Sequence, residues 1–237
     1  MQMRLGRLLI WITLFGISMA FLESSVVIYI RDLLYPGGFD FPLAVMEGSL
    51  AITEILREAA TLVMIAGAAV IAGRNSSERF AWFIYCFAIW DIFYYVFLKL
   101  LIGWPESILA WDVLFLIPVT WTGPVLSPII VCCYMLCLSG IIIFFTYRGI
   151  DTRIRLKEWI LLIAGALILI IAFTWDYSSF ILRNYSISEL INLPSAEPMF
   201  DLATRYLPEK FNWWLFIAGS LPILGSIAMI FSRHRSR

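Results

Sequence analysis

The chain has 237 residues, of which 62% are hydrophobic and 14% are charged, and its formal net charge is zero. Charged residues make up about a quarter of soluble domains, and a soluble protein of this length cannot bury so much apolar surface. The composition therefore predicts an integral membrane protein whose apolar exterior faces the lipid bilayer. No basic patch points to nucleic acid as a partner.

Six segments are apolar and close to the length of about 20 residues that a membrane-crossing helix needs. We therefore expect an all-α, polytopic membrane helix bundle that forms a single integral membrane domain over residues 1–237. The first segment resembles a signal peptide, with Arg4 and Arg7 before an apolar stretch, and we interpret it as an uncleaved helix. The predicted spans are residues 8–30, 48–73, 80–102, 128–146, 158–175 and 212–231.

Basic residues gather in alternate connections, which orients the bundle. The positive-inside rule places such connections in the cytoplasm. Both termini are then cytoplasmic, and we expect the protein in the cytoplasmic membrane of a bacterium or archaeon. The residues concerned are Arg4, Arg7, Arg74, Arg79, Arg148, Arg153, Arg155, Lys157, Arg233, Arg235 and Arg237.

A proline-rich stretch precedes the fourth span. Residues 111–128 are apolar but contain Pro118, Pro124 and Pro128. Because proline removes a backbone donor and breaks helices, we predict a bent or re-entrant segment that is shielded by protein.

A long outer loop, residues 176–211, precedes the sixth span. It contains Ser186 followed by Glu189, a capping-box pattern that predicts the start of a short helix. Residues 199–207 are typical of a second short amphipathic helix. Loops of this length are often functional lids, and packing over the helix ends is an equal alternative.

Ionisable side chains inside the spans form the main candidate site. A rise of about 1.5 Å per residue brings charges from the first three spans to one layer in their outer half. Helical spacing also aligns Glu47, Glu54 and Glu58 on one face, and Asp91, Tyr95 and Lys99 on another. The predicted polar cluster comprises Glu23, Glu54, Arg57, Glu58, Asp91, Tyr95 and Lys99.

Residues in the outer turns form the predicted rim of this cluster. The turns are rich in proline, glycine and aromatic residues, which is typical of anchored interfacial loops. Anchored turns are the favoured interpretation, and a mouth over the cluster or a docking surface is the alternative. The predicted rim residues are Arg31, Asp32, Glu47, Glu106 and Asp112.

The charges of the cluster do not balance, because four carboxylates face two cationic groups. Excess carboxylates in a low dielectric bind a proton or a cation. If a metal binds, its predicted ligands are Glu54, Glu58 and Asp91, which suit a hard cation. No other cofactor is expected, and the position of the one histidine, His234, in the basic tail excludes His-ligated haem within this chain alone.

Three functions fit these features, and the sequence leaves them open. Carboxylates within spans favour proton- or cation-coupled transport. Glu58 or Asp91 as a general base, with Arg57 holding an anionic head group, would instead suit a membrane enzyme acting on a lipid or lipid-like substrate. A purely structural cluster would suit an accessory subunit of a larger membrane complex. Besides the lipid bilayer, the expected partners are a membrane protein or further copies of the chain.

Overall fold

The computed structural model describes residues 2–117, 119–186, 188–189 and 202–235. Six of its helices are long and apolar enough to cross a membrane, so the predicted helix bundle is confirmed. They are α1 (Gln2–Leu34), α2 (Gly48–Ala72), α3 (Ser76–Ile102), α4 (Leu126–Tyr147), α5 (Leu156–Asn184) and α8 (Trp213–Arg235).

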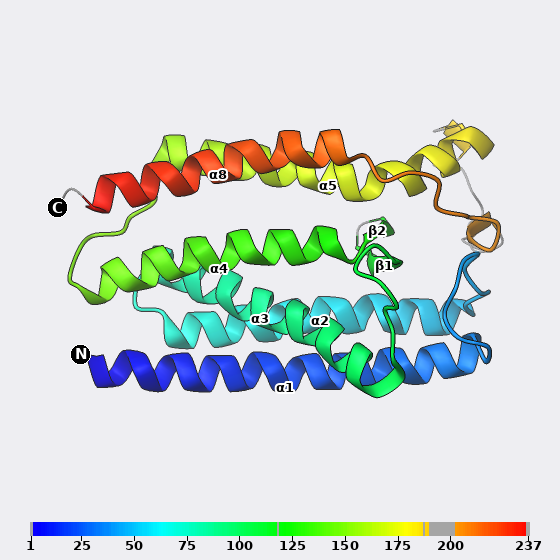
Figure 1. Cartoon of the computed structure of the whole chain (residues 1–237), viewed down its shortest axis with the longest axis horizontal. Coiled ribbons are helices and arrows are strands. Elements are labelled where there is room, and N and C mark those ends of the chain that lie inside the picture. The colour runs from blue at the N-terminus through cyan, green and yellow to red at the C-terminus, as the bar shows by residue number, and fades with distance from the viewer. Residues whose placement is uncertain (1, 118, 187, 190–201, 236–237) are drawn as a thin grey trace.

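The helices form two packed groups (Figure 1). The central helix α3 packs against α1, α2 and α4, while α5 and α8 pack against each other and α8 also contacts α4. Both termini lie at one end of the bundle, at the left of the figure. We call this the terminal end, and the opposite end the distal end.

Local capping groups define both ends of α3. Asn75 caps α3 because its side chain accepts a hydrogen bond from the Glu78 backbone N–H at 2.9 Å. Gly103 ends α3 with φ at 72°, a left-handed conformation that glycine adopts without steric cost. Lys99 donates to the Gly103 and Pro105 carbonyl oxygens at 2.9 and 2.8 Å, so its charge satisfies carbonyl groups beyond the helix end.

The segment between α3 and α4 forms a β-hairpin, an addition to the expected all-helical fold. Strands β1 (Trp111–Phe115) and β2 (Trp121–Pro124) pair antiparallel. Their register shifts between Val113 and Phe115, which leaves an extra residue in β1 and bends the strand. The hairpin packs on α5 and α4 through β2. Trp121 stacks on Phe173 of α5 with ring centroids 5.7 Å apart.

The outer loop is anchored over this hairpin. The Tyr206 hydroxyl is buried and donates to Asp176 of α5 at 2.6 Å, and it lies 2.9 Å from the Thr122 hydroxyl of β2. Burial raises the pKa of Tyr206, and the neighbouring Asp176 carboxylate raises it further, so the hydroxyl remains a donor. The predicted capping box is present, since Ser186 and Glu189 exchange hydrogen bonds. The first three residues of the second predicted short helix (199–207) lie outside the described residues.

An apolar core fills the bundle from the terminal end to its middle. Buried side chains from all six spans contribute, including Ile65 of α2, Trp82 of α3 and Ile142 of α4, each with none of its surface exposed. Trp90 of α3 also belongs to this core. Above Trp90, toward the distal end, the packing gives way to a cavity.

Candidate functional site

The cavity has a volume of about 290 Å³. Its walls come from the distal halves of α1 and α2, from α3 around Trp90, from β1 and from the loop between α1 and α2. Among the described residues, none from α4 or α8 lines it. Most of the lining is apolar, but the wall includes the charged residues Glu23, Arg31, Glu54, Arg57, Glu58, Asp91 and Asp112.

Arg57 of α2 joins two helices at the base of this wall. Its guanidinium forms an ion pair with Glu23 of α1 and another with Glu54 one turn earlier, where Nε donates to Oε2 at 2.9 Å. These three side chains are 11–20% exposed. The group therefore carries one excess negative charge when all three residues are ionised.

Glu58 lies on the same face of α2, because it follows Glu54 by four residues. Every buried residue of α2, from Ala51 to Ala72, belongs to this face. The Glu58 carboxylate accepts the backbone N–H of Leu116, at 3.0 and 3.2 Å from its two oxygens. It forms no ion pair with a described residue. The end of β1 is thus fixed to a buried carboxylate that is paired with no cation in the described part of the chain.

A second ion pair connects α1 to the hairpin. Arg31 donates to Asp112 of β1 at 3.0 Å, and both side chains are buried. The Tyr95 hydroxyl of α3 donates to the other Asp112 oxygen at 3.3 Å. The Arg31 guanidinium carbon lies 4.3 and 3.9 Å from the ring centroids of Phe39 and Trp104. Aromatic faces therefore flank a cation that carboxylate pairing already neutralises.

Asp91 of α3 completes the polar wall. It lines the cavity and accepts a hydrogen bond from the Cys132 thiol of α4 at 3.0 Å. A thiol is a weak donor, so this contact orients the carboxylate without balancing its charge. Like Glu58, Asp91 forms no ion pair with a described residue.

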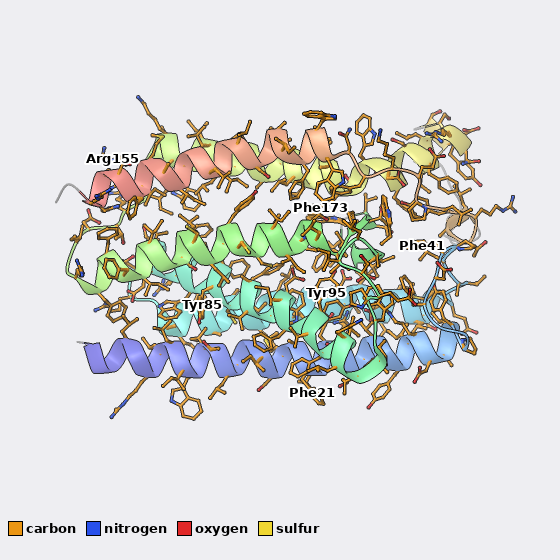
Figure 2. All side chains as sticks on the ribbon, viewed as in Figure 1. Phe21, Phe41, Tyr85, Tyr95, Arg155 and Phe173 are labelled. Carbon is orange, nitrogen blue, oxygen red and sulfur yellow. The ribbon has the colours of Figure 1, made fainter. Side chains whose placement is uncertain are left out.

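The loop between α1 and α2 covers the cavity at the distal end. Tyr35 and Phe39 both line it, and the Ala44 backbone N–H donates to the Tyr35 hydroxyl oxygen at 2.7 Å. Burial raises the pKa of Tyr35. Figure 2 shows Phe41 of this loop and Tyr95 of α3 toward the distal end, and Arg155 at the terminal end.

The structure brings five members of the predicted polar cluster to the cavity wall: Glu23, Glu54, Arg57, Glu58 and Asp91. Tyr95 lies behind the wall, in contact with Asp112. Lys99 lies apart from the cluster, where it is exposed and bonded to loop carbonyl groups.

Of the predicted rim residues, Asp32, Glu47 and Glu106 are exposed and do not line the cavity. Arg31 and Asp112 lie deeper than a rim, because they are buried in the wall. In the described ranges, no group of three His, Cys, Asp or Glu side chains is arranged to hold a metal ion.

Sequence reasoning missed the contribution of the hairpin and of the aromatic wall. The Leu116 N–H and the Cys132 thiol reach their carboxylates across 58 and 41 residues of sequence, and no local pattern signals such a pairing. The aromatic lining residues are Tyr35, Phe39, Trp90, Tyr94, Phe115 and Tyr177. A count of aromatic residues near the charged layer would have indicated some of them.

Fold and composition define an integral membrane protein, because six helices in the described part of the chain are long and apolar enough to cross a membrane. No protein-family model matches the chain, and no curated protein or solved structure matches it either. What the protein does must therefore be inferred from the chemistry of the cavity.

Proposed function

We propose that the protein is a proton- or cation-coupled membrane transporter, and that the cavity in the outer half of the bundle is its substrate site. One observation carries this proposal. A cavity with five carboxylates and two guanidinium groups lies in the distal half of the bundle, above a core that is apolar. Unbalanced carboxylates within membrane spans are the groups that bind a coupling proton or cation.

In this proposal, Glu58 and Asp91 take up the coupling ion, since neither is neutralised by an ion pair with a described residue. The hairpin is a re-entrant element at membrane depth, shielded from lipid by α4 and α5. The Glu23–Arg57–Glu54 group connects α1 to α2, so a change in its charge would alter how these two helices pack. The basic residues of the terminal end support a cytoplasmic location for that end.

Alternating access provides a test that needs no known substrate. The reporter is Val27→Cys, a cavity-lining position on α1, with the native cysteines replaced by Cys86→Ala, Cys132→Ser, Cys133→Ala and Cys137→Ala. Right-side-out and inside-out membrane vesicles are treated with a membrane-impermeant maleimide, with and without an imposed proton gradient. A transporter exposes Val27→Cys to the outer side, and to the inner side under one direction of the gradient.

Labelling from the outer side alone, under every gradient, would exclude transport. It would favour the alternative function, a membrane enzyme acting on a lipid-like substrate. One further observation supports this alternative. Ile55 lines the cavity, yet 41% of its surface is exposed on the flank of α2. A lipid-like molecule could therefore enter beside α2 from the bilayer.

A further inference from the structure

The charge of the cavity wall restricts its ligand. Both guanidinium groups are already paired, Arg31 with Asp112 and Arg57 with Glu23 and Glu54. With all groups ionised, the wall retains three negative charges, since five carboxylates face two guanidinium groups. An anionic ligand would add to an uncompensated charge in a low dielectric, whereas a cationic ligand would neutralise it.

The volume and the walls favour an organic molecule over a bare inorganic ion as the main occupant. The cavity of about 290 Å³ approaches the size of pockets that hold small organic molecules. A hard cation needs six to eight converging oxygen ligands, and no cluster of three candidate ligands exists among the described residues. Val27, Ile30 and Leu34 of α1 instead add an apolar surface to the wall.

Aromatic rings supply the remaining recognition. Six aromatic side chains line the cavity, and their faces attract organic cations when water is excluded. The protein already holds one delocalised cation in this way, since Arg31 in the cavity wall lies over the rings of Phe39 and Trp104. The aromatic rings that line the cavity would offer a bound organic cation the same kind of contact.

A buried donor is an independent sign of a ligand. Trp90 forms part of the cavity wall and is only 5% exposed. Its indole N–H has no hydrogen-bond partner among the described residues. Buried donors in folded proteins almost always have an acceptor, and an oxygen atom of a ligand or of a water molecule in the cavity would provide it.

We propose that the cavity binds an amphipathic organic cation, with its positive charge between Glu58 and Asp91 and its apolar body against α1 and the aromatic wall. The inference rests on the proposed function, because both require the cavity to take a ligand. It goes further by naming the substrate class.

Equilibrium binding to the purified, full-length protein in detergent tests this assignment. The probe is radiolabelled tetraphenylphosphonium, and tetraphenylborate is the control with the same shape and opposite charge. We expect saturable binding of the cation alone. Glu58→Gln and Asp91→Asn should each weaken it by at least about 30-fold, because each removes one partner of a desolvated charge pair. The matched control is Glu47→Gln, which changes an exposed acid at the start of the same helix.

Equal binding of the two probes, or full affinity in Glu58→Gln, would overturn the assignment. If the charge variants do not fold, protection of Val27→Cys from the maleimide replaces them: the cation must protect the cysteine and the anion must not. The two proposals fail separately. Cation binding without inner-side labelling rejects transport and supports the ligand class, whereas inner-side labelling without cation binding supports transport and rejects the ligand class.

Discussion

Arg57 lies between two glutamates that come from different helices. Its ion pairs with Glu23 and Glu54 are 11–20% exposed, so they are only weakly screened by water. In such a group the charges stabilise one another, but each would be costly alone. Loss of Arg57 would therefore leave the Glu23 and Glu54 carboxylates without their shared cation.

The substitution Arg57→Gln should destabilise the protein by about 3 kcal/mol, the effect of leaving buried charges without their partner. Thermal unfolding in detergent micelles measures this as a lower midpoint. The triple variant Glu23→Gln/Glu54→Gln/Arg57→Gln is the control, and it should recover much of the loss because neutral amides replace the unpaired charges. An unchanged midpoint in Arg57→Gln would mean that the ion pairs contribute nothing to stability.

The charged layer could be predicted from sequence at the level of single residues, because membrane depth and helical phase follow from residue number alone. Glu54 and Glu58 lie on one buried face as their spacing requires. The placement of Lys99 could not be predicted in this way. It follows Tyr95 by four residues on the same face of α3. At the end of this helix, however, its flexible side chain turns to the Gly103 and Pro105 carbonyl oxygens.

At the scale of elements, helix ends were less predictable than helix centres. The fifth span was expected to end at residue 175, yet α5 continues to Asn184. Tyr177 and Ile181 explain the extension, because they lie one turn apart and are buried with Leu202 and Tyr206 of the outer loop. Average hydropathy does not reveal these buried residues, because polar residues lie near them in the sequence.

The hairpin was missed for a different reason. Prolines and a short apolar run indicated a break in helical structure, but strand pairing depends on contacts that a single segment does not reveal. Gly123 illustrates this, because a Cβ atom there would lie 2.9 Å from the Phe211 ring. The need for glycine arises from a residue 88 positions away in sequence.

Close contact between α5 and α8 gives a prediction at this scale. A Cβ atom at Gly165 would lie 2.7 Å from the Gly219 carbonyl oxygen and 2.6 Å from an Ile223 side-chain carbon. Gly165→Val should therefore separate the two helices and destabilise the protein by about 1–3 kcal/mol, as overpacking typically does. Thermal unfolding checks this against Gly225→Val on α8, where no atom lies within 4 Å of the added Cβ. Equal midpoints for the two variants would contradict the prediction.

At the scale of the whole molecule, the two ends differ in charge. Arg74, Arg148, Arg153, Arg155 and Arg233 lie in the connections and helix end of the terminal end, which Figure 2 marks by Arg155. The class of protein and the number of spans follow from this sequence because apolar length is a local property. The cavity does not, because it depends on how α1, α2 and the hairpin meet.

Sidedness can be measured with two exposed positions. In the background without native cysteines, Glu106→Cys at the distal end should react with an impermeant maleimide only in right-side-out vesicles. Arg79→Cys, after the first turn of α3 at the terminal end, should react only in inside-out vesicles, because basic connections remain in the cytoplasm. The reverse pattern would invert the proposed orientation.

The apolar core between Trp90 and the terminal end also has an electrical consequence. Hydrocarbon-like packing conducts no ions, so most of a membrane voltage would fall across this layer and little across the cavity above it. An ion held at Glu58 would then be near the potential of the distal side. Carrying one elementary charge through the layer would require or release about 2.3 kcal/mol per 100 mV, which would make that step the most sensitive to voltage.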